Sequence, residues 1–183
     1  MILLGDAPPD PSIGLEMEDV RIAHLQGRLG STAQIGRAKA LEDAVNGGNG
    51  WTIVHQQGER SNMTRYWTIF DSMLAVAGGK DFNVIWGETD DLVYYALDRL
   101  TDAGLRSDDY IIVSFDGDCT AVELVKAGIV DVIAECTPLF ADQIGALPKR
   151  VDAGETVDKL QWAVEGVIDA TNVDEKLPLC FGS

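Results

Sequence analysis

The sequence of 183 residues lacks several features that would assign it to familiar protein classes. It has no apolar run near the ~20 residues that cross a bilayer, which argues against a membrane-spanning helix. Its first residues, MILLGD, hold a four-residue apolar start with no basic segment before it, so they do not form a secretory signal. The chain is therefore expected either to act in the cytoplasm or to be a processed or truncated part of a longer protein.

Cysteine and histidine are also scarce. The chain has three cysteines, Cys119, Cys136 and Cys180, and two histidines, at positions 24 and 55. An odd number of cysteines at these spacings fits neither a disulfide framework nor a zinc pattern. We expect Cys119 and Cys136 to pack as small buried side chains, and a catalytic Cys-His pair stays open. The sequence predicts no metal site.

Basic residues are few: 14 Lys and Arg stand against 30 Asp and Glu, for a net charge of −16. Such a field repels polyanions, so nucleic acid and anionic membrane surfaces are not expected partners. A neutral or cationic solute suits it, although solubility alone is the preferred explanation of the acidity. The catalytic and phosphate-binding fingerprints Gly-X-Ser-X-Gly, the P-loop and Gly-X-Gly-X-X-Gly are missing as well. We therefore predict a protein that is not an enzyme and has no cofactor.

The sequence does contain a regular alternation of strand-like and helix-like segments. Apolar strand-like runs occupy residues 20–25, 51–55, 82–86, 110–115 and 129–134. Helical patterns occupy residues 31–45, 62–77, 90–103 and 121–126, and a last helix begins near 138, which Pro148 should kink or break. This order predicts an α/β fold with a doubly wound parallel sheet and helices on both faces. Residues 163–176 should follow as an extended polar tail.

Polar residues gather at the ends of the predicted strands, where ligands bind in open α/β sheets. They lie in five loops, which span residues 26–32, 57–62, 87–91, 116–118 and 135–138, with Arg37 early in the first helix. Carboxylates and guanidinium groups bind vicinal hydroxyls through strong, oriented hydrogen bonds. Ser31, Asn62 and Asp90 have a competing role as helix caps, which we prefer for Asp90. For Asp116, between a strand and Gly117, we prefer a ligand role.

These motifs together resemble a known family. Phe115-Asp116-Gly117, followed by a short helix and Glu135-Cys136-Thr137-Pro138-Leu139, is similar to the type I periplasmic sugar-binding proteins, in particular the ribose- and galactofuranose-binding class. Leu25-Gln26-Gly27 with Arg37 resembles that family's first loop and ligand-binding arginine, and Thr89-Asp90-Asp91 stands where it has Asn-Asp-Asp. Residues 167–173 resemble its hinge and tail. The resemblance covers residues 20–177.

The resemblance implies a set of ligand-binding residues. Arg37 and Asp116 would bind sugar hydroxyls, Thr89 would stand in place of an asparagine, and Cys136 would lie near a position that is often a polar amide. Glu88 beside Thr89 completes the predicted set. The aromatic residue that the family places after the second strand, where it stacks on the sugar, is absent from residues 59–62.

The resemblance also implies an organisation. Family members have two similar lobes, and this chain has residues for one: 1–19 as a linker or remnant of the N-terminal lobe, 20–160 as the sugar-binding C-terminal lobe, and 161–183 as hinge and tail. The expected function is a non-catalytic sugar-binding lobe of an ABC-type uptake system, in the periplasm or lipid-anchored outside the cell. Its expected partners are a pentose or hexose and a membrane permease. A homodimer, with exchanged termini, would cover the exposed edges of a single lobe. The alternative function is the sugar-sensing effector domain of a transcription regulator.

Overall fold

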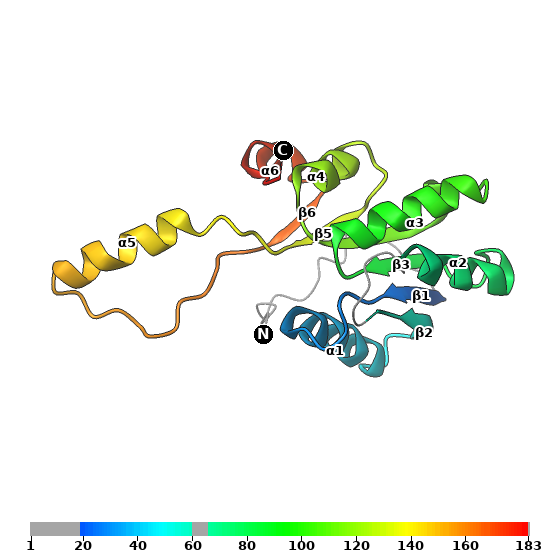
Figure 1. Cartoon of the computed structure of the whole chain (residues 1–183), viewed down its shortest axis with the longest axis horizontal. Coiled ribbons are helices and arrows are strands. Elements are labelled where there is room, and N and C mark those ends of the chain that lie inside the picture. The colour runs from blue at the N-terminus through cyan, green and yellow to red at the C-terminus, as the bar shows by residue number, and fades with distance from the viewer. Residues whose placement is uncertain (1–18, 60–65, 183) are drawn as a thin grey trace. The chain divides into compact units, whose positions relative to one another are not determined.

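The computed structural model describes residues 19–59 and 66–182. The chain divides into two compact units, Met1–Val113 and Ser114–Ser183. Figure 1 labels the elements, which in chain order are β1 (Val20–Leu25), α1 (Thr32–Asn46), β2 (Trp51–Gln57), α2 (Tyr66–Ala77), β3 (Val84–Gly87), α3 (Asp90–Asp102), the 3-10 turn η2 (Ser107–Asp109), β4 (Ile111–Asp116), α4 (Cys119–Lys126), β5 (Val132–Glu135), α5 (Ala141–Asp152), β6 (Val167–Asp169), α6 (Val173–Lys176) and η3 (Leu177–Leu179). The predicted cap at Asn62 lies outside the described residues.

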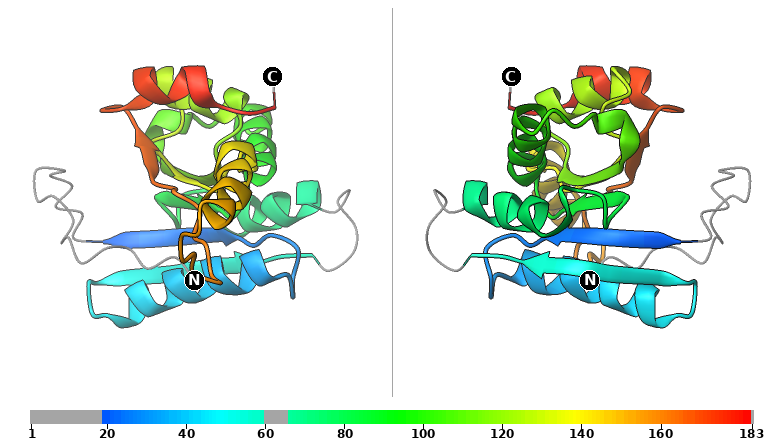
Figure 2. Two further views of the ribbon diagram at one scale, coloured as in Figure 1. Left: turned by 90° about the vertical axis from the view of Figure 1, so that its left-hand side faces the viewer. Right: turned by 90° about the vertical axis from the view of Figure 1, so that its right-hand side faces the viewer.

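The first unit is built on parallel strands in the order β2-β1-β3-β4. The step from β1 to β2 runs in one direction, and the step from β2 to β3 crosses back over β1. Right-handed crossovers therefore place α1 on one face and α2 on the other, as the two views of Figure 2 show. This reversal creates a topological switch point between the carboxyl ends of β1 and β3, where open α/β sheets bind ligands.

Strand β1 is buried on both faces, which explains its almost continuous apolar sequence. Val20 and Ile22 pack with Leu41 of α1 and with Val84 of β3. Ala23 and Leu25 point to the opposite face and are also fully buried. Burial of a leucine of this kind stabilises the fold by about 1.5–3 kcal/mol. The first loop and α1 are thus fixed to a rigid strand.

In the second unit, β5 pairs with β6 in antiparallel orientation, with Val132 opposite Asp169 and Ala134 opposite Val167. The full strand order is β2-β1-β3-β4-β5-β6. The predicted α/β class with a doubly wound parallel sheet is confirmed, and β6 adds one antiparallel strand to it. The expected extended tail over 163–176 was wrong, because β6 and α6 form within it. A three-residue strand and a four-residue helix carry too little periodicity to be recognised in a sequence.

Pro148 does not break the last long helix, since α5 runs from Ala141 to Asp152 with the proline inside it. A proline removes one backbone hydrogen bond, here to the carbonyl of Ile144. None of the described side chains of α5 is buried, so water can bind that carbonyl and the loss costs less than in a core helix. None of the helices in the described part of the chain combines the length and apolar character that crossing a bilayer requires.

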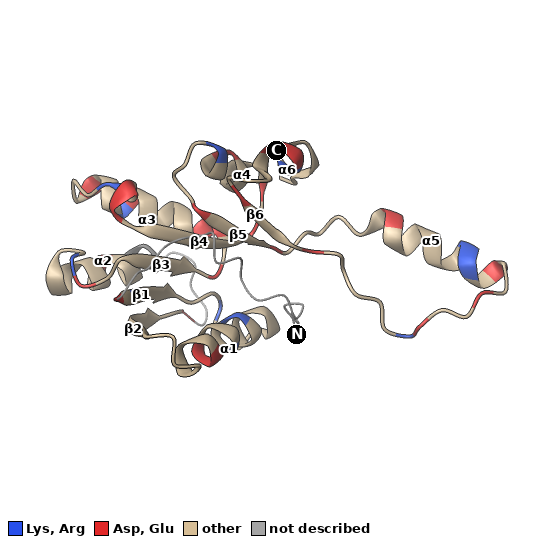
Figure 3. Cartoon of the chain, turned by 180° about the vertical axis from the view of Figure 1, so that it is seen from behind, with Lys and Arg blue, Asp and Glu red and all other residues tan. Residues whose placement is uncertain are grey.

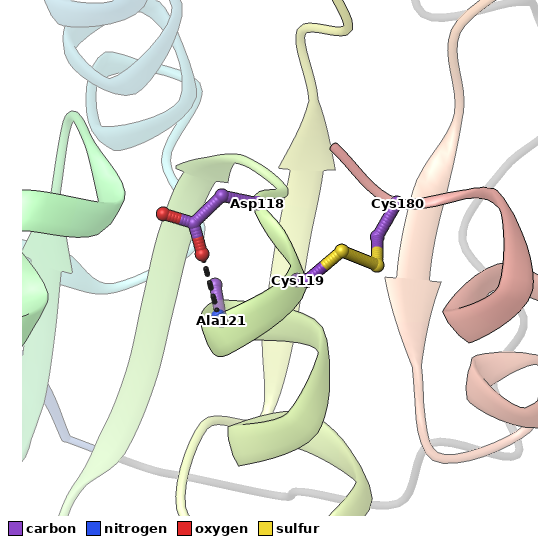
Figure 4. Close-up of a disulfide and its surroundings, with 4 residues drawn as sticks. All are labelled: Asp118, Cys119, Ala121 and Cys180. Atoms are coloured by element: carbon purple, nitrogen blue, oxygen red, sulfur yellow. Dashed lines mark hydrogen bonds between the residues drawn. A yellow bond between two sulfur atoms is a disulfide. The ribbon is translucent and has the colours of Figure 1, made fainter. Parts of the chain in front are cut away.

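A disulfide joins Cys119, at the start of α4, to Cys180 near the C-terminus, with a sequence separation of 61 residues (Figure 4). The expectation that Cys119 packs as a small buried thiol was therefore wrong, and the odd cysteine count was a poor guide to whether a disulfide forms. Three cysteines allow one bond plus a remaining thiol, and the sequence does not reveal which pair comes together.

Candidate functional site

Glu88 lies at the switch point of the first unit, directly after β3, and its side chain is completely buried. Its Oε2 accepts a hydrogen bond of 2.7 Å from the backbone N–H of Gly27, and its Oε1 lies 2.9 Å from Nε2 of His24. Both carboxylate oxygens therefore bind the end of β1 and the loop after it. Direct contact of Glu88 with a ligand stays a prediction. The observed hydrogen bonds connect the loop after β3 to the end of β1 and to the loop after β1.

Arg37 of α1 lies against the same residue. Its Nη1 donates a hydrogen bond to the backbone carbonyl of Glu88, and only 9% of Arg37 is exposed. Ser31 caps α1 by accepting a hydrogen bond of 3.2 Å from the N–H of Gln34, which sets the position of the helix on which Arg37 lies. The structure thus brings together Arg37 and Glu88, two of the predicted ligand-binding residues.

Thr89 is the N-cap of α3, with extended backbone angles and an Oγ1 that accepts a hydrogen bond of 3.4 Å from the N–H of Leu92. The prediction that Asp90 caps this helix was wrong. Asp90 is already in the first turn of the helix and is 3% exposed. The residue before the first helical one provides the cap, and a threonine hydroxyl can serve there. A hydroxyl that accepts this bond keeps its proton for donation to a ligand.

The loop after β2 packs against the loop after β1. Gln26 N–H donates to the carbonyl of Gln57 at 2.9 Å, and Leu29 N–H donates to that of Glu59 at 3.1 Å. A Cβ atom at Gly58 would lie 2.7 Å from the Cβ of Gln26, so only glycine fits this approach. The rest of the predicted binding loop, residues 60–62, lies outside the described residues.

Asp116 ends β4 in the second unit with a φ of 95°, the one positive φ of a non-glycine residue in the described part of the chain. Such a conformation costs about 1–3 kcal/mol and persists where surrounding structure holds it. Its carbonyl accepts a hydrogen bond of 3.0 Å from the N–H of Cys136 after β5. Cys136 is exposed and outside the disulfide, so the expectation of a buried Cys136 was wrong. The structure places Asp116 and Cys136 side by side.

The five predicted residues thus form two groups, one in each unit: Arg37, Glu88 and Thr89 in the first, and Asp116 and Cys136 in the second. That both groups face one solute stays a prediction. Lys and Arg are scattered over several elements (Figure 3). No group of three His, Cys, Asp or Glu residues suited to a metal ion occurs within residues 19–59 and 66–182.

His24 is the functional candidate that the sequence did not reveal. It was interpreted only as part of a strand, yet its ring is completely buried against the Glu88 carboxylate. The signal was available: a histidine in an otherwise apolar strand needs a buried polar partner. A carboxylate at the end of the neighbouring strand is a natural one.

Comparisons with known proteins agree with the family resemblance. No family model matches the sequence. The galactofuranose-binding protein YtfQ of Escherichia coli K12 is 25% identical over 142 residues, which are 76% of this chain and 45% of that protein. The arabinose-binding periplasmic protein of Shewanella sp. ANA-3, solved with L-arabinofuranose, is 21% identical with a TM-score of 0.74, over 88% of this chain and 54% of that one. The myo-inositol-binding protein of Caulobacter is 24% identical with a TM-score of 0.72, over 93% of this chain and 59% of that one.

The chain spans about half the length of the proteins it matches. The two solved structures establish the fold, and the E. coli protein extends the similarity to the sequence. The polar residues that follow β1, β3, β4 and β5 lie on the scaffold that these proteins share. The chain is therefore similar, in sequence and in fold, to one lobe of the type I periplasmic sugar-binding proteins.

Proposed function

We propose that the chain is a non-catalytic sugar-binding lobe of a solute-binding protein that serves an ABC-type uptake system. The similarity to the galactofuranose-binding protein is the observation that carries this proposal. Proteins of the same fold bind arabinofuranose and myo-inositol, so the expected solute is a small ring with several hydroxyl groups. The partner that receives it would be the membrane permease of the transporter.

The residues suit such a solute in different ways. Arg37 offers a rigid fork of N–H donors held by α1 and by the carbonyl of Glu88. Asp116 offers carboxylate oxygens that accept hydrogen bonds from sugar hydroxyls, and Thr89 and the exposed Cys136 add weaker polar contacts. We propose that Glu88 acts indirectly, because its carboxylate already binds His24 and Gly27.

A location outside the cytoplasm also belongs to the proposal. The disulfide between Cys119 and Cys180 supports it, because such bonds persist in the periplasm and at the cell surface and are rare where thiols are kept reduced. The printed description of the Shewanella protein as periplasmic points the same way.

A homodimer completes the proposal. Residues 139–164 carry large apolar side chains that are more than half exposed, namely Leu139, Ile144, Val151, Leu160, Trp162 and Val164. Exposed apolar side chains gathered in one segment favour an interaction surface there. We propose that a second copy of the chain covers it.

Isothermal titration calorimetry of the full chain with D-galactose, L-arabinose and myo-inositol tests the sugar-binding function. At least one of the three is expected to bind, with a Kd in the micromolar range or weaker, because a single lobe does not enclose its solute. Arg37→Ala and Asp116→Asn should each weaken that binding about tenfold or more, because each removes a charge-assisted hydrogen bond.

The matched controls remove an exposed charge from the same helix or the same unit. Lys39→Ala lies on α1 and pairs with Asp43, and Asp174→Asn lies on α6 and pairs with Lys126. Both should bind as the unaltered chain does. Equal losses in the controls, binding of none of the three solutes, or turnover of a glycoside substrate would each refute the proposed function.

A further inference from the structure

The loop from Asp116 to Cys119 is held from two directions within the second unit. Asp116 and Gly117 both have positive φ angles, of 95° and 90°. A glycine adopts that conformation readily, but an aspartate adopts it at a cost. Structure around Asp116 must therefore hold it in place.

One support comes from the inside of the unit. The carbonyl of Asp116 accepts the N–H of Cys136. A Cβ atom on Gly117 would lie 3.4 Å from Ile168 of β6 and 3.6 Å from Ile133 of β5, so the loop rests closely on these two strands. These contacts with β5 and β6 fix the backbone of Asp116 and Gly117 where the loop faces the sheet.

The other support comes from the C-terminus, through the segment Cys180–Gly182, which we name the C-terminal clasp. The N–H of Cys119 donates a hydrogen bond of 2.8 Å to the carbonyl of Phe181, and Asp118 pairs with Phe181 as a single parallel bridge. Asp118 also caps α4 through a hydrogen bond of 2.9 Å to the N–H of Ala121 (Figure 4). The clasp thus contacts the two residues that follow Gly117.

The disulfide makes this clasp permanent. Cys180 is covalently bound to Cys119 (Figure 4), so Cys180 cannot separate from the start of α4 while the bond is intact. The turn η3, just before the clasp, contains no buried residue, and the backbone hydrogen bond and the bridge of the clasp go to Cys119 and Asp118. The bond between Cys119 and Cys180 thus adds a covalent link beside the hydrogen bond between Cys119 and Phe181.

We propose that Cys119 and Cys180 are positioning residues for ligand binding, whose bond holds the Asp116 loop in its unusual conformation and so aims the Asp116 carboxylate at the solute. This inference rests on the proposed function for its effect on affinity. The other part of the inference is that the conformation of the Asp116 loop depends on the clasp, and this part can be tested without a ligand.

The test compares the unaltered full chain with Cys119→Ser/Cys180→Ser. Amide hydrogen exchange followed by mass spectrometry should show faster exchange in peptides that contain Gly117–Cys119 and the C-terminal residues, and unchanged exchange in α1 and β1. The Kd for whichever of D-galactose, L-arabinose or myo-inositol binds best should rise about tenfold, the loss of one well-placed charge-assisted hydrogen bond.

Val125→Ala is the matched control, because Val125 is a buried residue of α4 in the same unit, six residues after Cys119. It should lower the thermal midpoint and leave both the Kd and the exchange of Gly117–Cys119 unchanged. A purely stabilising disulfide would make the two variants behave alike, which would overturn the proposal.

The outcomes separate the two proposals. If the unaltered chain binds none of the solutes, the proposed function fails, and the exchange data alone decide whether the clasp holds the loop. If the unaltered chain binds and the serine variant binds equally well, the clasp proposal fails and the function stands. If the serine variant does not fold, a phosphine reductant added to the folded unaltered chain cleaves the bond directly, and unchanged exchange of Gly117–Cys119 then overturns the proposal.

Discussion

The Nε2 atom of His24 lies 2.9 Å from Oε1 of Glu88, and both side chains are completely buried. This contact joins the penultimate residue of β1 to the residue after β3, across the switch point of the sheet. The other carboxylate oxygen binds the N–H of Gly27. One buried glutamate therefore fixes the relative positions of two loops, and Arg37 in turn is held by its carbonyl.

Replacement of Glu88 by alanine should lower the free energy of unfolding by about 3 kcal/mol, because it leaves His24 and the Gly27 N–H buried without a partner. Glu88→Gln should cost about 1 kcal/mol, since an amide can still accept from Gly27 and donate to His24. Urea unfolding at pH 7 measures both. Ordinary surface substitutions change the free energy of unfolding by up to about 0.5 kcal/mol. A smaller loss for the alanine variant would show that the hydrogen bonds of Glu88 do not contribute to stability.

Asp116 offers a test in which stability and binding move in opposite directions. Asp116→Gly should raise the free energy of unfolding by about 1 kcal/mol, because glycine accepts a φ of 95° without steric cost. It should also abolish the contribution of the carboxylate to solute binding. Thermal unfolding and calorimetry on the same preparation give both quantities, and a destabilised glycine variant would contradict the interpretation of Asp116 as strained.

Tyr110 should make stability fall in alkaline solution. Burial, and then the nearby charges of Asp109 and Asp81, raise the pKa of Tyr110 above its ordinary value of 10.0. As the pH rises past that value, the unfolded chain loses this proton before the folded chain does, so the free energy of unfolding decreases until the raised pKa is passed.

Tyr110→Phe removes this part of the pH dependence. At neutral pH it should cost about 1 kcal/mol, for the lost hydrogen bond of 2.9 Å to the carbonyl of Gly79. Urea unfolding between pH 8 and about pH 11 compares the two chains. If the free energies of unfolding of the two chains differ by the same amount at every pH, Tyr110 has the same pKa in the folded and the unfolded chain, which would contradict the prediction.

The proposed homodimer is tested on α5. Light scattering after size-exclusion chromatography should give twice the monomer mass at high protein concentration. Val151→Lys should shift the protein to monomer, because it places a charge in the apolar surface of α5. Ala146→Lys lies on the opposite side of the same helix and should leave the dimer intact. A single monomeric species of the unaltered chain at every concentration would rule the dimer out.

The sequence predicted the α/β alternation well, because long buried strands such as Val20–Leu25 and capped helices such as α1 carry strong local signals. The convergence of Arg37 and Glu88 followed from topology, since β1 and β3 are neighbours in a doubly wound sheet. The way in which they meet did not follow. Arg37 donates to the backbone carbonyl of Glu88, and the Glu88 side chain turns instead to His24 and to the N–H of Gly27.

The misses have a common physical cause. The short β6 and α6, the bond between Cys119 and Cys180, and the strained Asp116 are all set by contacts between residues distant in sequence. The pairing of Glu135 with Gly166 in the backbone and with Lys176 through its side chain illustrates such contacts. Local propensity does not encode them.

The covalent link at the C-terminus also changes how the chain responds to cleavage. The exposed Lys149 and Arg150 of α5 lie between the two linked cysteines. A trypsin cut there divides the backbone, yet the fragment that holds β6 and α6 stays tethered to the body. The nicked protein should therefore migrate as one species until a reductant separates it into two bands.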